Sequence, residues 1–295
     1  MLNGVRLILT VLIALFNGGI AYLLALGLTG SQWWGLFWTV LVIAGLFALA
    51  RSKYGERYLR AMYRMRHPVG DEKSILNAAW REVCKKAGVS PDDYDLFLLP
   101  ASPQDDLNAV AVGRRTVAVT PGMLKVPQEE LEAVLAHELA HLAHKDSEYL
   151  LFISIVNAVG TAAVWALTSL VVFYGLVTSV FSGFSGMGEG RMAGGIGILF
   201  ALLGWLLKLC AWICTKIFQI AYLGLSRQIE YRCDSCAVWW GFGPGLVNFL
   251  CRIWPLEAKR DTRVVAVLFA SHPPTGERIK RVVEAIKKEG SRYAG

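Results

Sequence analysis

The residues of this chain best suited to chemistry are two histidines, His137 and His141, with Glu138 beside the first. They follow a run of good helix formers that begins at residue 129, so one helix is predicted through all three. A four-residue spacing places both imidazoles on one helix face, about 6 Å apart along the axis, where both can reach one metal ion. Zinc binds imidazole nitrogen at roughly 2.0–2.1 Å, and Glu138 is suited to activate a metal-bound water. This HExxH pattern predicts a zinc site, but so short a pattern also arises by chance and needs a third ligand.

Two residues further along the chain are candidates for that ligand. His144 is close in sequence, but on a continuous helix it would lie about 10.5 Å along the axis from His137, too far to share a metal ion. Glu230 completes a two-His, one-Glu site and leaves a fourth position for water. Asp234 lies four residues later on the same helix face and can accept a hydrogen bond from a ligand imidazole. The alternative is that both carboxylates only form ion pairs with neighbouring arginines, but their combination with HExxH favours the metal site.

The elements that must position these residues include four long apolar runs, in a chain that is 55% hydrophobic. A bilayer core needs about 20 apolar residues per helix, so the runs predict four transmembrane helices in an integral membrane protein. For the first run a cleaved signal peptide is the alternative, but its length and the second run close behind it favour a retained anchor. The four runs are residues 7–28, 33–50, 149–188 and 194–213.

Basic residues set the expected orientation of these spans. Six Lys and Arg residues follow the second span within residues 51–66, whereas the connections on the other side carry few charges. The positive-inside rule therefore places both termini and the active site in the cytoplasm, at a plasma membrane or bacterial inner membrane. The net charge of +7 is attributed to this topology and to anionic lipid. Nucleic acid is not an expected partner, because no basic–aromatic pattern for RNA binding is present.

The parts outside the apolar runs predict an α+β domain with a small sheet. Residues 71–87 predict an amphipathic helix that stops at Gly88, and residues 108–112 and 116–119 predict a hairpin. The predicted fold is a mainly α membrane protein with its catalytic domain in two halves. Residues 1–50 and 149–225 hold two transmembrane helices each, and residues 51–148 and 226–295 form the halves of the catalytic domain.

Two further features have both a structural and a functional reading. Cys233 and Cys236 form a Cys-x-x-Cys pair, but no second pair completes a structural zinc site, so plain helical cysteines in a reducing compartment are favoured. Near the C-terminus, His272 stands before two prolines that restrict its backbone, and Arg278 follows. His272 could donate to a developing oxyanion, and Arg278 could stabilise it or orient a carboxylate. Composition alone favours a structural turn for this segment.

The ordered set of motifs resembles the HtpX branch of membrane zinc metalloproteases, relatives of the CAAX prenyl endopeptidases. The resemblance covers nearly the whole chain, and it implies a zincin-like (gluzincin) catalytic domain with one Zn²⁺ at the cytoplasmic membrane face. It further implies action on misfolded or damaged membrane proteins. The motifs are, in order, two spans, Asn108-Ala109, His137 to His141, two more spans, Ser226-Arg227, Glu230, Asp234, His272-Pro273-Pro274 and Arg278.

The resemblance also implies that residues 108–112 form an edge strand to which an extended substrate adds. The expected substrate-binding residues are Asn108, Ala109, Val110 and Ala111, because peptide amides can pair with a strand edge. The chain departs from the usual family pattern at Pro121, Ile229 and Cys233. None of these three is expected to touch a metal ligand.

The predicted reaction is hydrolysis of a peptide bond by a zinc-dependent endopeptidase. Glu138 is expected to take a proton from water and pass it to the leaving nitrogen, while His272 or Arg278 stabilises the oxyanion. Two alternatives stay open: a processing protease for one membrane or lipidated substrate, and a zinc-stabilised membrane adaptor that does not cut. The expected partners are membrane-protein or unfolded polypeptide substrates and the lipid bilayer. The sequence leaves the oligomeric state unknown.

Overall fold

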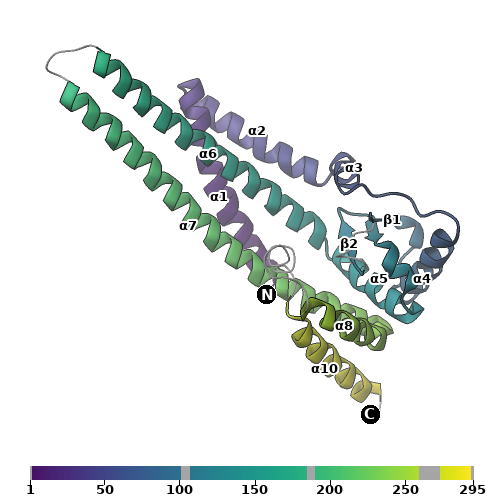
Figure 1. The fold of residues 1–295 in the computed structure, drawn as a ribbon. Coiled ribbons are helices and arrows are strands. Elements are labelled where there is room, and N and C mark those ends of the chain that lie inside the picture. Colours follow the sequence, from purple (N-terminus) through teal and green to yellow (C-terminus); the bar gives the residue numbers. More distant parts are fainter. Residues whose placement is uncertain (1, 101–106, 185–189, 259–272, 294–295) are drawn as a thin grey trace. The chain divides into compact units, whose positions relative to one another are not determined.

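The computed structural model describes residues 2–100, 107–184, 190–258 and 273–293 of the 295-residue chain (Figure 1). The chain divides into two compact units. The first consists of Met1–Phe47 and Phe152–Tyr222, and the second of Ala48–Leu151 and Leu223–Gly295. All the residues of the predicted metal site belong to the second unit.

The first unit is helical and contains the apolar runs. Its helices are α1 (Leu2–Thr29), α2 (Gln32–Ala50), and most of α6 (Asp146–Phe184) and α7 (Gly190–Ala237). In the part of the chain that the structure describes, one helical window, Gln32–Leu49, is long and apolar enough to cross a membrane. A shorter apolar helical stretch is Thr161–Val177. The four predicted spans therefore stay a prediction, although each apolar run is helical where it is described.

The second unit packs helices around a three-stranded sheet, as predicted. The sheet order is β1-β3-β2, with β3 (Thr116–Val119) parallel to β1 (Asp95–Leu98) and antiparallel to β2 (Ala109–Val112). Strands β2 and β3 form the predicted hairpin, in which Ala109 pairs with Val119 and Val112 with Thr116. β2 is consequently an edge strand of this sheet. The helices of the unit are α3 (Lys53–Met62), α4 (Asp71–Ala87), α5 (Gln128–Ala143), α8 (Gly243–Ala258) and α10 (Thr275–Tyr293).

Helix α4 has the predicted limits. Gly88 follows it in the left-handed conformation, at φ 71°, and its N–H bonds back to the carbonyls of the last turn. Glycine adopts this conformation without steric penalty, which explains why the helix ends there. Short 3₁₀ turns at Pro91–Asp93 and Pro121–Lys125 precede β1 and α5, and Pro127 stands directly before α5.

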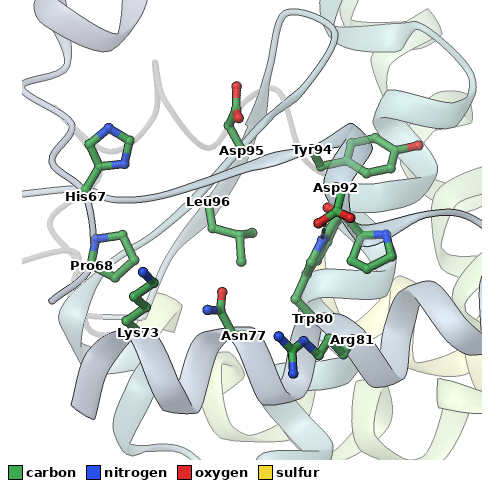
Figure 2. A pocket seen from close by; sticks show the side chains of 11 residues that line it. His67, Pro68, Lys73, Asn77, Trp80, Arg81, Asp92, Tyr94, Asp95 and Leu96 are labelled. Carbon is green, nitrogen blue, oxygen red and sulfur yellow. Dashed lines mark hydrogen bonds between the residues drawn. The ribbon is translucent and has the colours of Figure 1, made fainter. Parts of the chain in front are cut away.

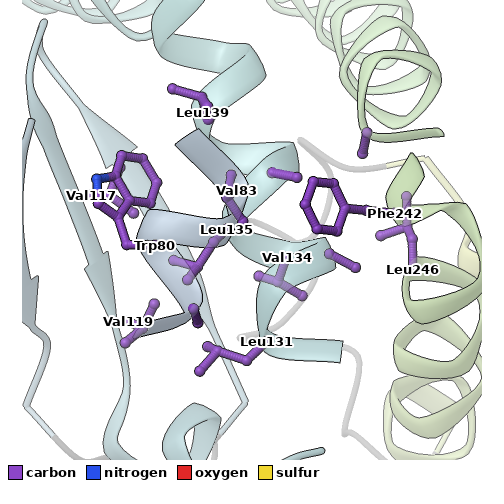
Figure 3. Packing of buried hydrophobic residues seen from close by; sticks show 14 of the residues in the cluster. Trp80, Val83, Val117, Val119, Leu131, Val134, Leu135, Leu139, Phe242 and Leu246 are labelled. Atoms are coloured by element: carbon purple, nitrogen blue, oxygen red, sulfur yellow. The ribbon is translucent and has the colours of Figure 1, made fainter. Parts of the chain in front are cut away.

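Helix α5, which carries the HExxH motif, is the central element of the second unit. Every residue from Glu130 to Leu142 is buried, and the helix contacts α4, α8, β2 and β3. Figure 3 shows its apolar side chains between Val117 and Val119 of β3 on one side and Phe242 and Leu246 on the other. The α5 residues in this core are Leu131, Val134, Leu135 and Leu139.

The contact between α8 and α5 requires a glycine. A Cβ atom at Gly245 would lie 2.3 Å from the carbonyl oxygen of Glu129, far inside van der Waals contact. α8 therefore approaches the first turn of α5 at backbone distance, and the chain reaches it from α7 through a short π-helical turn at Val238–Phe242. This packing surrounds the motif helix with rigid elements and fixes the direction of its histidines.

Candidate metal centre

Helices α5 and α7 bring His137, His141 and Glu230 together, all three buried. The two Nε2 atoms lie 3.2 Å apart, and each lies 3.4 Å from an oxygen of Glu230. Ligands at roughly 2.0–2.1 Å in tetrahedral geometry are separated by about 3.3–3.4 Å, because a tetrahedron's edge is about 1.63 times its radius. The two contacts use different oxygens of Glu230, Oε2 for His137 and Oε1 for His141. The imidazole nitrogens thus have the spacing of two corners of a zinc coordination sphere, with the Glu230 carboxylate placed to be a third ligand.

The chemistry of these atoms also fits a cation. The Nδ1 atom of each histidine faces a carboxylate, Asp234 for His137 and Asp146 for His141, and would carry the ring proton. Both Nε2 atoms then present lone pairs to each other and to the Glu230 carboxylate, an arrangement that is repulsive without a shared positive charge. A divalent cation bound there would supply that charge, and neutral imidazole and ionised carboxylate are ligands that zinc prefers.

The imidazole pKa values reflect the same excess of negative charge. Burial alone would lower the pKa of His137, but the carboxylates of Asp234 and Glu230 outweigh it and raise that pKa. Burial acts in the same direction on His141, whose neighbours Cys233, Asp146 and Glu230 raise its pKa well above the usual value. In the metal-free protein, protons are therefore attracted to the position that a metal ion would take.

His137 is held by a buried ion pair. Its Nδ1 lies 2.9 Å from Oδ1 of Asp234, and Arg278 donates to both oxygens of that carboxylate, at 2.6 and 2.9 Å. Burial would raise the pKa of Asp234, but the Arg278 guanidinium and His137 lower it to about 2. Asp234 is therefore a carboxylate at any physiological pH, which favours the His137 tautomer with its proton on Nδ1.

His141 has a second support that the sequence patterns did not reveal. Its Nδ1 lies 3.5 Å from Asp146 Oδ2, and Arg232 donates to both oxygens of Asp146, at 2.5 and 2.6 Å. Each of the two histidines thus faces an aspartate that an arginine holds. The signal was available in part, because Asp146 follows His141 by five residues, but α5 ends at Ala143 and a helical wheel cannot place residues beyond it.

The prediction that Cys233 touches no metal ligand is wrong. Its Sγ lies 3.5 Å from Nδ1 of His141 and 3.6 Å from Oδ2 of Asp146, so the thiol stands beside the contact between them. Burial raises the pKa of Cys233 to about 11, so the group is a neutral thiol and a weak hydrogen-bond donor. Cys233 therefore contacts a metal-ligand candidate, whereas Cys236 has no part in this contact.

The other residues considered in the sequence for the metal site are Glu138, Arg278, His272 and His144. Glu138 is buried on α5 between the two histidines, and Arg278 is close enough to be influenced by its charge. Arg278 itself is buried, with Nη1 3.7 Å from Glu230, so its contacts are with carboxylates, and an oxyanion role stays a prediction. His272 lies outside the described residues. His144 follows the last residue of α5 and binds the Ala140 carbonyl instead of joining the metal group.

Among the described residues, the predicted substrate strand has no partner on its outer edge. Asn108 and Thr120 continue the β2–β3 pairing by one residue, because the Thr120 N–H donates to the Asn108 carbonyl and the Asn108 N–H donates to the Thr120 hydroxyl. Backbone groups alternate along an antiparallel strand, so those of Val110 also face β3, and those of Ala109 and Ala111 face away from it. Ala109 and Ala111 therefore present the amides available for an added strand, and the Asn108 side chain is exposed.

A separate hollow of about 490 Å³ lies beside β1 and α4 (Figure 2). Its lining mixes basic, acidic and aromatic side chains, and it includes none of the predicted site residues. Lys73, Asn77 and Arg81 come from α4, while Asp95 and Leu96 come from β1. The metal group is thus formed independently of this hollow.

Comparisons with known proteins point to one family. Residues 71–286 match Peptidase family M48. A protease HtpX homolog of Pelotomaculum thermopropionicum is 32% identical over 253 residues, which cover 78% of this chain and 82% of that protein. A protease HtpX homolog of Persephonella marina is 29% identical over 306 residues, covering 92% and 94% respectively. The crystal structure of S. mikatae Ste24p matches with a TM-score of 0.51 at 17% identity, covering 95% of this chain and 66% of Ste24p, which shows a shared fold.

Proposed function

The chain belongs to peptidase family M48, and on this premise we propose that it is a zinc-dependent endopeptidase that cuts misfolded or damaged membrane proteins at the cytoplasmic membrane surface. Two predictions from the motifs are confirmed, namely the resemblance to HtpX proteases and the metalloprotease activity. The observation that carries the zinc assignment is the buried convergence of His137, His141 and Glu230 at 3.2–3.4 Å.

The proposed roles follow from where each side chain lies. His137, His141 and Glu230 would hold the zinc ion, and Asp234 and Asp146 keep the two imidazoles oriented. When bound, zinc would supply a Lewis acid for the scissile carbonyl and for water. As the water oxygen bonds to the carbonyl carbon, Glu138 takes a water proton, and it delivers that proton to the leaving nitrogen when the C–N bond breaks.

The open edge of β2 supports an extended peptide as substrate. A peptide that pairs with the outward amides of Ala109 and Ala111 is recognised through its backbone, and its side chains are selected only weakly. Asn108, at the start of this edge, is exposed and can add a side-chain contact to the peptide. Weak side-chain selection suits a protease that removes many different unfolded membrane proteins.

The proposed location rests on the four helical apolar runs and on the basic segment after the second. With four spans, the two halves of the second unit, Ala48–Leu151 and Leu223–Gly295, emerge on one side of the membrane. The excess of Lys and Arg after the second span favours the cytoplasmic side. Membrane proteins with unfolded segments would then reach the protease by diffusion in the same bilayer.

The proposal is tested by the Glu138→Gln variant of the full chain in detergent, with unfolded casein as substrate. Loss of the general base should lower the cleavage rate by about 10²–10⁴-fold, while the zinc content stays that of wild type. Glu129→Gln is the matched control, because Glu129 is an exposed glutamate on the same helix. Equal cleavage by Glu138→Gln and wild type would refute the assigned base, and zinc binding without cleavage by wild type would favour a membrane adaptor.

A further inference from the structure

Helix α3 presents two unlike faces. It is capped at its start by the Ser52 side chain, which accepts a hydrogen bond from the Gly55 N–H. Gly55 and Glu56 are buried, whereas positions 53, 54, 57, 58, 61 and 62 are exposed. The exposed positions repeat every four residues, so they form one continuous face of the helix.

The exposed face combines tyrosines with basic residues. Tyr54 and Tyr58 are 62% and 68% exposed, and Met62 continues their stripe at 51%. Lys53 and Arg57 form the adjacent stripe, and neither has an acidic partner among the described residues. Tyrosine favours the boundary between water and bilayer, since its ring is apolar and its hydroxyl is polar. Basic side chains at that depth are attracted to anionic headgroups.

The charge of the segment fits one kind of surface. Between residues 51 and 70 the only acidic residue is Glu56, which is 7% exposed and faces the protein. Three of the six basic residues are already paired within the protein, Arg51 with Glu148, Arg60 with Asp95, and Arg66 with Glu72. The cations left on the outward face of α3 are therefore available to an external anion.

The buried face of α3 is attached to the substrate hairpin. Glu56 Oε1 accepts hydrogen bonds from the Thr116 hydroxyl at 2.6 Å and from the Arg115 N–H at 3.2 Å. A Cβ atom at Gly113 would lie 2.9 Å from Cδ of Glu56, so the turn of the hairpin rests directly on this carboxylate. Arg60 adds a 2.8 Å bond to the Thr116 hydroxyl and a 2.9 Å bond to Asp95.

From these two faces we propose that α3 is an interfacial helix that binds anionic phospholipid headgroups through Lys53 and Arg57. Through Glu56 it holds the β2–β3 hairpin, and so the open substrate edge, at a fixed position on the membrane surface. This inference rests on the proposed function, because it requires the protease to be bound to a membrane. It adds anionic phospholipid as a partner, and it connects that lipid through α3 and Glu56 to the substrate edge of β2.

The test compares hydrogen exchange of the full chain in nanodiscs of phosphatidylcholine with exchange in nanodiscs that also contain phosphatidylglycerol. Anionic lipid should slow exchange in residues 53–62 and in residues 109–119. Each basic residue near an anionic surface contributes about a fivefold affinity, so Lys53→Gln/Arg57→Gln should weaken the affinity of α3 for anionic headgroups by about 25-fold. The double variant should therefore lose the protection of both segments. Lys85→Gln/Lys125→Gln removes two exposed charges elsewhere in the unit and should respond like wild type.

A second variant separates the two parts of the proposal. Glu56→Ala should keep the protection of residues 53–62 and lower that of residues 109–119, because the helix still meets lipid but no longer accepts hydrogen bonds from Thr116 and Arg115. The lipid assignment is overturned if wild type shows no dependence on phosphatidylglycerol, or if the Lys85/Lys125 control loses the response equally. Equal protection by soluble polyglutamate in phosphatidylcholine nanodiscs would identify an acidic polypeptide as the partner instead. The comparison of the two lipid compositions requires neither bound zinc nor cleavage, so failure of the proposed function would be seen separately, in metal content and casein hydrolysis.

Discussion

Replacing Asp234 by Ala should weaken metal binding by more than the loss of one contact to His137. Asp234 also holds Arg278, whose Nη1 lies only 3.7 Å from the Glu230 carboxylate. Without Asp234, Glu230 is the remaining ion-pair partner of the buried guanidinium among the described residues. We expect Arg278 to move onto Glu230 and compete with the metal ion for that carboxylate.

The two effects have different magnitudes. Loss of a carboxylate that orients a ligand histidine lowers metal affinity by about 10–100-fold. Movement of the Arg278 nitrogen from 3.7 Å to about 2.8 Å strengthens its attraction to Glu230 by about 1.4 kcal/mol at an effective dielectric constant of about 20, which is a further factor of about ten. Asp234→Ala should therefore lose about 100–1,000-fold in zinc affinity, and Asp234→Ala/Arg278→Met only about 10–100-fold.

The assay is a competition for zinc between the purified full chain and a fluorescent chelator, at constant pH. The double variant should bind zinc about tenfold more tightly than the single variant, although it lacks one more site residue. Urea unfolding of the metal-free proteins checks folding, since an unpaired buried charge costs about 3–5 kcal/mol and the double variant removes it. The reasoning is refuted if the double variant binds zinc no better than Asp234→Ala, or if Asp234→Ala binds it as wild type does.

Three more outcomes follow from the site and the sheet. Asp146→Asn should lower zinc affinity by about 10–100-fold through His141, whereas Cys233→Ala, which removes a weak sulfur contact, should change it less than about threefold in the same competition assay. Ala111→Pro removes an outward N–H of β2 and should raise the KM for casein while the chain stays folded. Val110→Pro removes an N–H that faces β3 and should lower the urea midpoint of unfolding. Equal effects of the two variants on that midpoint would contradict the register of β2. The pKa of Asp234 falls from 3.8 to about 2 on folding, so its stabilisation is present above about pH 4 and is lost as the pH falls toward 2. The free energy of unfolding of the metal-free protein should therefore fall by about 2 kcal/mol between pH 5 and pH 2 because of Asp234. Urea unfolding of Asp234→Ala at the same pH values should not show this decrease.

The local elements of the second unit were predictable because their signals are short-range. The limits of α4 are given by its amphipathic pattern and by Gly88, and the hairpin by two alternating β segments around residues 113–115. The HExxH helix is equally local, since helix formers extend through it and its burial follows from the apolar residues on all its faces. Only the proposed third ligand, Glu230, needed a long-range argument, and that argument was chemical, because two histidines alone do not complete a zinc site.

The surroundings of the ligands were less accessible to sequence reasoning. Asp146 and Cys233 meet beside His141, although Asp146 begins α6 and Cys233 lies in the last turns of α7. No spacing rule relates two such positions. The contact of Arg278 with Asp234 joins α10 to α7. From the sequence around it, Arg278 was equally suited to stabilise an oxyanion. Such pairings depend on how α8 and α10 fold back onto the unit, which no single segment encodes.

The central claim is that Glu230 and the two histidines form one zinc site that carries out peptide hydrolysis. Zinc content by mass spectrometry, measured together with casein cleavage on wild type and Glu230→Ala, tests it most directly. Wild type is predicted to hold about one equivalent of zinc and to cleave casein, and Glu230→Ala to lose both while retaining its helical circular dichroism. A folded Glu230→Ala protein that keeps a full equivalent of zinc and wild-type cleavage would contradict the account.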